Sequence, residues 1–348
     1  MSRQLKATKF RALSLADPFF DSLKAGYSGF EAWFKSKADE DVYVIEDGRR
    51  ISGMIYLKHE DGAVEDVDPV LPSKRWLKIG TLKIDGRGTK LGERVLKKIF
   101  DRAVDEDREG IYVTVFDLHA DLIGLFERYG FKRYGVKETS DGTELVLARV
   151  FAELSGDVVA DYPFFRTAGR KSWLLAVYPE YHSRLLPDSI LRNESREIVQ
   201  DVSHTNTIHK MYIGRLSLTR MRRGDLVFIY RTTDHVGPAF YRSVATSVCV
   251  VEETKRKKDF EDEESFIKYA SPHSVFARDE LRAMFAEPRL YVAKMTYNSA
   301  FNTRITRGRL MEEVGIKKNP RWDFRELTHD EAAAILTMGK VNARLIVD

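Results

Sequence analysis

Leu82-Lys-Ile-Asp-Gly-Arg-Gly-Thr-Lys-Leu-Gly92, followed by Glu93-Arg-Val-Leu-Lys-Lys-Ile-Phe100, decides the fold of the first half of this 348-residue chain. The stretch begins as an apolar strand, breaks at glycines and restarts as an amphipathic helix. Apolar residues recur at every fourth position of that helix and predict one buried stripe: Leu91, Val95, Ile99 and Ala103. Gly86, Gly88 and Gly92 allow a tight turn, so several N–H groups converge at the positive end of the helix dipole. The stretch therefore predicts a cradle for a phosphate group.

The spacing of these glycines excludes two common phosphate-binding loops, because the dinucleotide fingerprint needs G-x-G-x-x-G and the P-loop needs G-x-x-x-x-G-K-[ST]. The order Arg87-Gly-Thr-Lys-Leu-Gly92 instead resembles the pyrophosphate loop of the GNAT N-acetyltransferases, which is Arg/Gln-x-x-Gly-x-Gly/Ala after a central strand. Lys90 stands where that family usually has glycine. An ordinary glycine-rich turn before a helix is the alternative interpretation.

A second segment, about thirty residues further on, extends the resemblance. The strand Ile111–Phe116 precedes His119-Ala-Asp-Leu-Ile-Gly-Leu-Phe-Glu-Arg-Tyr-Gly-Phe131, which is similar to the GNAT pattern Asn-x-x-Ala-x-x-x-Tyr-x-x-x-Gly-Phe. His119 occupies the usual position of a cofactor-contacting Asn, and Phe126 occupies that of the general-acid tyrosine. The resemblance covers residues 1 to about 150.

The resemblance implies an α/β fold, in which a mixed sheet is flanked by helices, and acetyl-CoA-dependent transfer of an acetyl group to an amine. It also implies a set of residues that contact acetyl-CoA. These residues are Leu82, Lys83, Ile84, Arg87, Gly88, Thr89, Lys90, Leu91, Gly92, His119 and Phe126.

The missing hydroxyl at Phe126 weakens the prediction of turnover without excluding it. The leaving group is a thiolate whose pKa resembles that of cysteine, about 8.5, so expelling it unprotonated at pH 7 costs roughly 2 kcal/mol. General acid catalysis contributes about 10²–10⁴-fold. Tyr129, one helical turn later, is a candidate replacement acid, or alternatively a tyrosine that covers the helix end before Gly130.

The attacking amine must lose a proton, which calls for a nearby carboxylate or histidine. Glu60 is the first candidate because it follows the strand Ile51–Lys58, and His119 is the second. The alternative for Glu60, which lies in the charged run His59-Glu-Asp61, is a solvated surface residue. The sequence does not choose among these hypotheses.

Length and composition predict two domains, since 348 residues with 43% hydrophobic content suffice for two ordinary cores. Residues 1–150 hold 26 basic and 26 acidic residues, so the whole net charge of +4 lies in the remainder. The single cysteine, Cys249, excludes an internal disulfide and sits in an apolar run typical of a buried core. No stretch has the length of a membrane span, and Met1–Ala7 lacks the apolar core of a secretory signal, so we expect a cytoplasmic protein.

Turn and periodicity patterns locate the elements of the first half. The pattern predicts helices at Asp17–Lys24 and Tyr27–Phe34, whose aromatic residues dock on the sheet; a hairpin of Val42–Ile45 and Ile51–Leu57 through Asp47-Gly48; and a last strand, Leu145–Val150, after the turn Asp141-Gly142. Periodicity fades between Ala152 and Arg170. We therefore expect a first domain at residues 1–152, a linker at 153–170 and a second domain at 171–348.

The second half predicts short strands between short helices, which is typical of a small β-barrel. The expected strands are Trp173–Val177, Leu226–Tyr230, Ala239–Val251 and Tyr291–Met295, and the expected helices are Arg278–Phe285 and Thr328–Leu336. The segments Met221–Arg231 and Gly237–Glu252, with Gly-Asp before a core strand, resemble the PUA-like superfold and in particular its ASCH and EVE domains.

The PUA-like resemblance implies an RNA or modified nucleic acid as partner. Arg222, Arg223, Arg231 and Tyr241 are the candidate contacts, within a set that also holds Arg215, Arg220, Tyr230 and Phe240. The alternative is a solvated arginine-rich helix before a core strand. Lys255–Lys258 is followed directly by Glu261–Glu264, which indicates a self-compensating loop, whereas Asn302–Arg309 adds to the surface if it shares a face with Arg222 and Arg223.

No metal site is expected, because His204 and His209 are five residues apart and the other histidines are scattered without a cysteine partner. Three functions remain open. They are an N-acetyltransferase whose second domain presents a nucleic acid, a nucleic-acid-binding protein with a catalytically weak GNAT domain, and a protein N-acetyltransferase with a protein-interaction domain. GNAT relatives often form homodimers, but no heptad pattern indicates self-association here.

Overall fold

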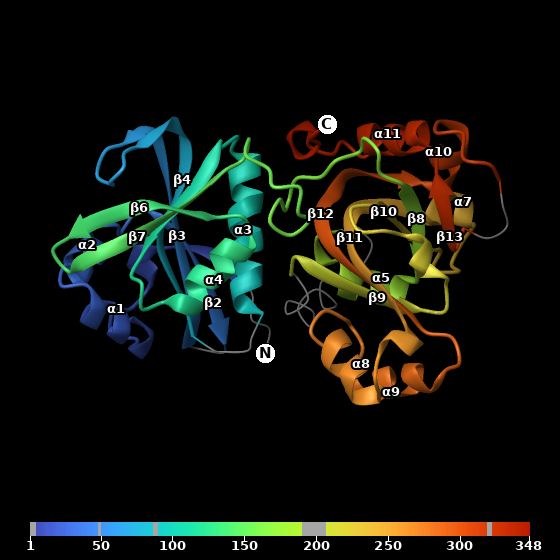
Figure 1. Ribbon diagram of the computed structural model, residues 1–348, viewed down its shortest axis with the longest axis horizontal. Coiled ribbons are helices and arrows are strands. Elements are labelled where there is room, and N and C mark those ends of the chain that lie inside the picture. The colour runs from blue at the N-terminus through green and yellow to red at the C-terminus, as the bar shows by residue number, and fades with distance from the viewer. Residues whose placement is uncertain (1–4, 48–49, 86–89, 190–206, 319–321) are drawn as a thin grey trace. The chain divides into compact units, whose positions relative to one another are not determined.

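The computed structural model describes residues 5–47, 50–85, 90–189, 207–318 and 322–348 (Figure 1). The chain divides into two compact units, Met1–Ala160 and Asp161–Asp348. The division falls within the segment 153–170, where periodicity fades in the sequence.

The first unit is built on a seven-stranded mixed sheet with the order β1-β2-β3-β4-β5-β7-β6, in which β4 and β5 are parallel and the other neighbours are antiparallel. The expected α/β class of this half is confirmed. The strands are β1 (Leu5–Lys9), β2 (Asp41–Asp47), β3 (Arg50–Val64), β4 (Leu71–Ile84), β5 (Gly110–Val115), β6 (Lys132–Thr139) and β7 (Gly142–Val150).

The helices of this unit cover both faces of the sheet (Figure 1). They are α1 (Asp21–Gly26), α2 (Phe30–Ser36), α3 (Leu91–Asp105) and α4 (Ala120–Arg128). We call the face of the sheet that packs on α3 and α4 the helix face. On it, the guanidinium of Arg149 in β7 lies 4.6 Å from the centre of the Phe100 ring. The other face, here the aromatic face, packs on α1, α2 and the turns before them through a cluster that includes Phe10, Phe20, Phe34 and Tyr56. The expected docking of aromatic residues on the sheet is confirmed.

The predicted hairpin forms, and so does the predicted turn before the last strand of this unit. β2 and β3 pair up to Asp47 and Arg50, and the turn residues 48–49 lie outside the described residues. β6 and β7 pair up to Thr139 and Gly142, where Gly142 has φ 127°. The Asp-Gly turn chemistry therefore locates these strand ends.

A β-bulge at Gly80 separates β4 from β5. Tyr56 pairs with Thr81 and Leu57 with Ile79, so Gly80 is an extra residue in β4. A Cβ on Gly80 would lie 2.7 Å from Cδ1 of Tyr56, so only glycine lets this ring lie against the strand. Beyond the bulge β4 remains paired with β3 up to Ile84, whereas its ladder with β5 among the described residues ends at Ile79. A wedge-shaped gap in the hydrogen-bonded sheet follows.

The second unit holds a six-stranded mixed sheet with the order β13-β8-β10-β11-β12-β9. Its strands are β8 (Ser172–Val177), β9 (His209–Gly214), β10 (Leu226–Arg231), β11 (Val244–Arg256), β12 (Tyr291–Thr306) and β13 (Phe324–Leu327), and its helices include α5 (Pro179–Leu185), α7 (Ala239–Arg242), α8 (Glu263–Ala270), α9 (Arg278–Ala286), α10 (Arg307–Glu312) and α11 (His329–Met338). The expected helices in the segments 278–285 and 328–336 are confirmed.

Two expectations for this unit need correction. The strands described do not close into a barrel, because β13 and β9 are edges of the sheet with no ladder between them in the described chain. The expected strand Ala239–Val251 begins only at Val244, because α7 forms after Pro238 and a bidentate ion pair of Arg242 with Asp234 holds the chain there.

The Gly-Asp dipeptide before β10 has a structural role. Gly224 has φ 89°, and the buried Asp225 carboxylate accepts hydrogen bonds from Nε1 of Trp173 at 3.0 Å and from the Arg222 N–H at 2.9 Å. Since Trp173 lies on β8, this single carboxylate joins β8 to the turn that precedes β10.

Replacing Gly80 with alanine should lower the stability of the first unit, because the new Cβ meets the Tyr56 ring and overpacking of this kind costs about 1–3 kcal/mol. Thermal unfolding of Gly80→Ala checks this result. Gly124→Ala in α4 is the matched control, since a Cβ there meets nothing within 4 Å. Equal midpoints for the two variants would show that the Tyr56 contact does not constrain β4.

Acid should destabilise the second unit through the buried Glu252. Burial raises the pKa of Glu252, but the hydrogen bond from His209 and the charges of His209 and Lys294 outweigh this effect and hold the pKa below its usual value. A folded-state pKa below the unfolded one stabilises the protein above pH ~4.3, and this contribution is lost as the pH falls through the folded-state value. Unfolding midpoints at pH 7 and pH 3 should therefore differ less for Glu252→Gln than for the wild type, and an equal difference would contradict this account.

Candidate functional site

The gap between β4 and β5 is the centre of the candidate site. Thr81, Leu82, Lys83 and Ile84 of β4 are partly exposed, and their ladder with β3 leaves the other edge of the strand facing the gap. Side chains alternate along a strand, so Lys83 lies on the aromatic face, where its ammonium lies over the Phe19 ring at 4.6 Å. Leu82 and Ile84 therefore point to the helix face.

The first turn of α3 follows this strand. Lys90 is the N-cap residue of α3, and burial lowers the pKa of its ammonium. Leu91 is buried, and a Cβ on Gly92 would lie 2.8 Å from Cδ2 of Leu125, so Gly92 permits the close approach of α4 to α3. The remaining predicted loop residues lie outside the described residues: Gly86, Arg87, Gly88 and Thr89.

The predicted residues of α4 occupy different environments. His119 is the exposed N-cap residue of the helix. Phe126 is fully buried with its ring 4.8 Å from that of Phe131, and Tyr129 is 1% exposed with its ring 6.3 Å from that of Phe100. His119 and Tyr129 flank the nine residues of α4 and are thus about 15 Å apart. The structure does not bring the two predicted catalytic residues together, and their roles stay predictions.

Glu60 lies on the aromatic face beside the β4–β5 ladder, where it pairs with Trp76, three residues before the described ladder ends at Ile79. Its carboxylate contacts the ammonium of Lys58 at 2.8 Å and that of Lys78 at 3.5 Å, and it accepts a hydrogen bond from the Tyr112 hydroxyl. Tyr112 directly precedes Val113, the last residue of the β4–β5 ladder. Burial raises the pKa of Glu60, but these partners outweigh it and lower the pKa overall. Glu60 is therefore an ionised carboxylate that binds cations better than it accepts a proton.

A second carboxylate on the same face was not singled out from the sequence. Glu144 is 5% exposed and lies on β7, one residue before Leu145, which pairs with Val115 at the end of β5. The Tyr27 hydroxyl donates a hydrogen bond to its Oε1 at 3.1 Å, and the Tyr27 ring lies 5.3 Å from that of Phe116. Burial and the Glu144 charge raise the pKa of Tyr27, so its hydroxyl remains a donor.

One feature of the sequence could have identified Glu144 as a functional residue. In β7 the buried positions Val146 and Ala148 alternate with residues of the helix face, and Glu144 continues this period as an acidic residue at an otherwise apolar position. Its partner Tyr27 is 117 residues away in the chain, and no local pattern links the two.

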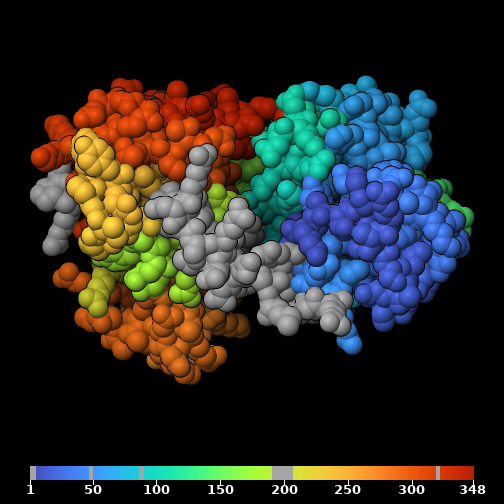
Figure 2. All heavy atoms as spheres, turned by 180° about the vertical axis from the view of Figure 1, so that it is seen from behind, coloured from blue at the N-terminus to red at the C-terminus, as the bar shows by residue number. Residues whose placement is uncertain are grey.

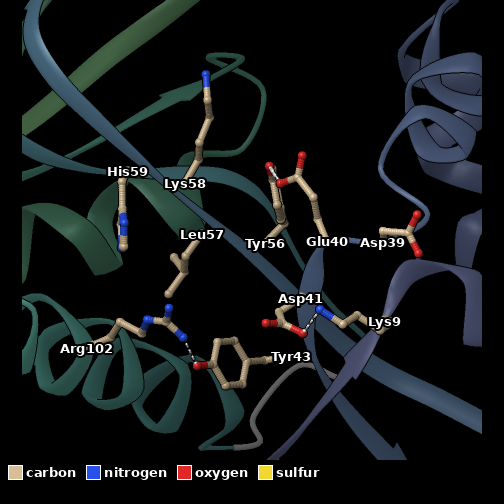
Figure 3. A pocket seen from close by; sticks show the side chains of 10 residues that line it. All are labelled: Lys9, Asp39, Glu40, Asp41, Tyr43, Tyr56, Leu57, Lys58, His59 and Arg102. Atoms are coloured by element: carbon tan, nitrogen blue, oxygen red, sulfur yellow. Dashed lines mark hydrogen bonds and ion pairs between the residues drawn. The ribbon is translucent and has the colours of Figure 1, made fainter.

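A separate hollow of about 320 Å³ lies beside β1, β2 and the end of α3 (Figure 3). Within it Lys9 contacts Asp41 at 2.7 Å and Arg102 of α3 donates to the Tyr43 hydroxyl, while Lys58 and His59 pair with Glu60 and Glu106 outside the lining. None of the residues predicted for the site lines it.

In the second unit the predicted nucleic-acid contacts lie at opposite ends of β10. Arg222 and Arg223 are exposed before the strand, whereas Arg231 is its last residue, about 17 Å further on, and is only 4% exposed. Tyr241 is 69% exposed on α7, beyond the Arg231 end of the strand. The structure therefore does not join the four residues into one surface.

The segment 302–309 lies at the Arg231 end. Arg231 pairs with Val244, and Val244 pairs with Thr306. The Arg307 guanidinium lies over the Trp322 ring at 4.6 Å. The segment 302–309 therefore does not share a face with Arg222 and Arg223, and it does not extend the basic surface predicted from the sequence.

No group of three or more His, Cys, Asp or Glu side chains among the described residues is arranged to hold a metal ion. Among the helices described, none is long and apolar enough to cross a membrane. His204, one of the two histidines compared in the sequence, lies outside the described residues.

Comparison with known proteins finds no matching family model and no matching curated protein. Several solved structures are similar in fold. ASCH from Zymomonas mobilis is 12% identical and covers 49% of this chain and 96% of its own, with a TM-score of 0.34. A GNAT family acetyltransferase from Elizabethkingia anophelis with acetyl-CoA bound is 12% identical and covers 42% of this chain and 97% of its own, with a TM-score of 0.31.

An IAA acetyltransferase from Bacillus cereus gives similar values, at 12% identity, 43% and 99% coverage and a TM-score of 0.31. The similar structures thus include both kinds of domain that the sequence resembles, each over about half of the chain.

Proposed function

We propose that the first unit transfers an acyl group from acetyl-CoA to an amine. One observation carries this proposal: among the described residues the β4–β5 ladder ends shortly before a helix N-terminus on one face, with the buried Glu144 carboxylate on the other. An anionic cofactor and a cationic acceptor can therefore approach the same gap from opposite faces.

The residues around the gap fit acetyl-CoA. The unpaired edge of β4 at residues 80–84 offers backbone N–H and C=O groups to an amide-containing chain, as a neighbouring strand would. The N-terminus of α3 and the Lys90 ammonium favour phosphate groups. When bound, acetyl-CoA supplies a thioester carbonyl and a thiolate leaving group.

The two carboxylates of the aromatic face differ in what they can do for the acceptor. Glu60 is already paired with the ammonium groups of Lys58 and Lys78, so Glu144 is the carboxylate left to act on an acceptor amine. Glu144 accepts the proton that the ammonium must lose before its nitrogen lone pair can attack, and Tyr27 holds the Glu144 carboxylate in place. The proton then leaves Glu144 for solvent or for the departing thiolate, so the carboxylate is regenerated.

We also propose that the second unit binds RNA or a modified nucleic acid, which carries or accompanies the acceptor. A second candidate for the whole protein is a nucleic-acid-binding protein whose first unit transfers acyl groups only weakly. This alternative is favoured because Phe126 has no hydroxyl and Tyr129 is buried, so neither side chain offers a proton donor at the gap. An acceptor amine on a protein is the third possibility that the test below includes.

Acetyl-CoA should bind the wild-type protein with a micromolar Kd in isothermal titration, and thiol release should rise above hydrolysis when spermidine, a lysine-containing peptide or tRNA is added. Binding without stimulated thiol release from any of the three would favour the second candidate. Absence of acetyl-CoA binding would overturn the proposed function.

Glu144→Gln should reduce kcat for the best of these amines by about 10²–10⁴-fold and leave the Kd of acetyl-CoA unchanged, because only proton acceptance is lost. Tyr27→Phe should lower kcat by less than Glu144→Gln does, because the carboxylate remains but loses the hydroxyl that holds it. Glu65→Gln, an exposed residue of the same unit, is the matched control. A kcat of Glu144→Gln within twofold of that control would remove Glu144 from the mechanism.

A further inference from the structure

A groove in the second unit lies between the end of β11 and the lobe formed by α8 and α9. Figures 1 and 2 show this lobe at the lower edge of the unit. It packs on β9 and β12 through Phe266, Ile267 and Leu281. The groove has a volume of about 490 Å³. Its lining residues are Arg256, Lys257, Lys258, Phe260, Phe285, Pro288, Arg289, Leu290 and Tyr291.

The acidic run beside this groove is neutralised elsewhere, which corrects the self-compensating loop expected from the sequence. Glu264 pairs with Arg278 at 2.5 Å, and Glu263 pairs with Arg282 at 3.4 Å. Both arginines belong to α9. Glu263 and Glu264 therefore hold the two helices together and do not neutralise Lys257 or Lys258.

Three cations of the groove keep their charge available. Lys257 donates to the backbone oxygen of Glu287 at 3.1 Å and lies over the Phe285 ring at 5.0 Å, so its ammonium is oriented without a carboxylate partner among the described residues. Lys258 and Arg289 are exposed, and within the described chain no carboxylate lies at ion-pair distance from either. Arg256, by contrast, is paired with Asp259 at 3.4 Å.

Cations beside aromatic rings in a concave surface are the features that hold a single-stranded nucleic acid, in which phosphates meet the cations and bases contact the rings. Phe260, Phe285 and Tyr291 supply partly exposed aromatic surface here. A volume of this size accommodates a base or nucleotide rather than the side of a duplex. We propose that this groove binds single-stranded nucleic acid, with Lys257, Lys258 and Arg289 contacting phosphates.

This site differs from the surface predicted from the sequence. The Gly224 N–H bonds to the Val251 oxygen, so Arg222 and Arg223 lie beside the middle of β11, whereas Arg256 ends that strand about 17 Å further on. The proposal deepens the nucleic-acid part of the proposed function and rests on that part only. It is independent of acyl transfer by the first unit.

Fluorescence anisotropy with labelled oligo(U) and oligo(dT) 12-mers tests the site on the full chain. Lys258→Glu/Arg289→Glu should weaken binding at least tenfold and reduce the slope of log K against log salt by about 1.4, since each phosphate contact on a single strand contributes about 0.7. Binding of either oligomer supports the proposal, and the tighter one identifies the sugar. A 12-bp duplex should compete poorly.

Lys317→Glu/Lys318→Glu is the matched control, because both lysines are exposed, lie outside the groove and give the same change in net charge. An equal loss of oligonucleotide binding in this control would show that only the overall charge matters, and would overturn the proposal. If Arg222→Glu/Arg223→Glu lost binding and the groove variant did not, the second unit would still bind nucleic acid, but the assignment of the site to the groove would be overturned. Absence of binding by the wild type would overturn the nucleic-acid partner as well, while acetyl-CoA binding reports separately on the first unit.

Discussion

The contact between the Tyr56 ring and Gly80 is the constraint on which the first unit depends. Because the ring occupies the space of a Cβ, only glycine fits at this position of β4, and among the described residues the ladder with β5 ends one residue earlier, at Ile79. The sheet is continuous below the bulge. The first turn of α3 on one face and Glu144 on the other therefore lie around one gap.

Charge is separated by the sheet itself. The helix dipole of α3 and Lys90 lie on one side of the gap, while Glu144, held by the Tyr27 hydroxyl, lies on the other. An anion and an ammonium group therefore find complementary surfaces without competing for one site. In the second unit ion pairs keep opposite charges apart. The arginines of α9 neutralise Glu263 and Glu264, which leaves the cations of the groove available.

The sequence predicted features that arise from local chemistry. Asp-Gly turns located the predicted hairpin and the turn before the last strand of the first unit, and the four-residue apolar period located α3. Features that depend on distant partners were missed or wrong. Glu144 gained its role from Tyr27 across 117 residues, the second sheet did not close within the described chain, and the acidic run after Lys258 paired with a helix that follows it. Proximity in sequence was a poor guide to charge compensation, because side chains of neighbouring elements compete for the same partners.

Hydrogen–deuterium exchange of the first unit with and without acetyl-CoA tests the central claim most directly. If the cofactor pairs with the open edge of β4, amides in residues 80–84 become protected on binding, and those in residues 76–79, already paired on both sides, change little. Protection confined to other elements, or none in residues 80–84 at saturating acetyl-CoA, would contradict the account.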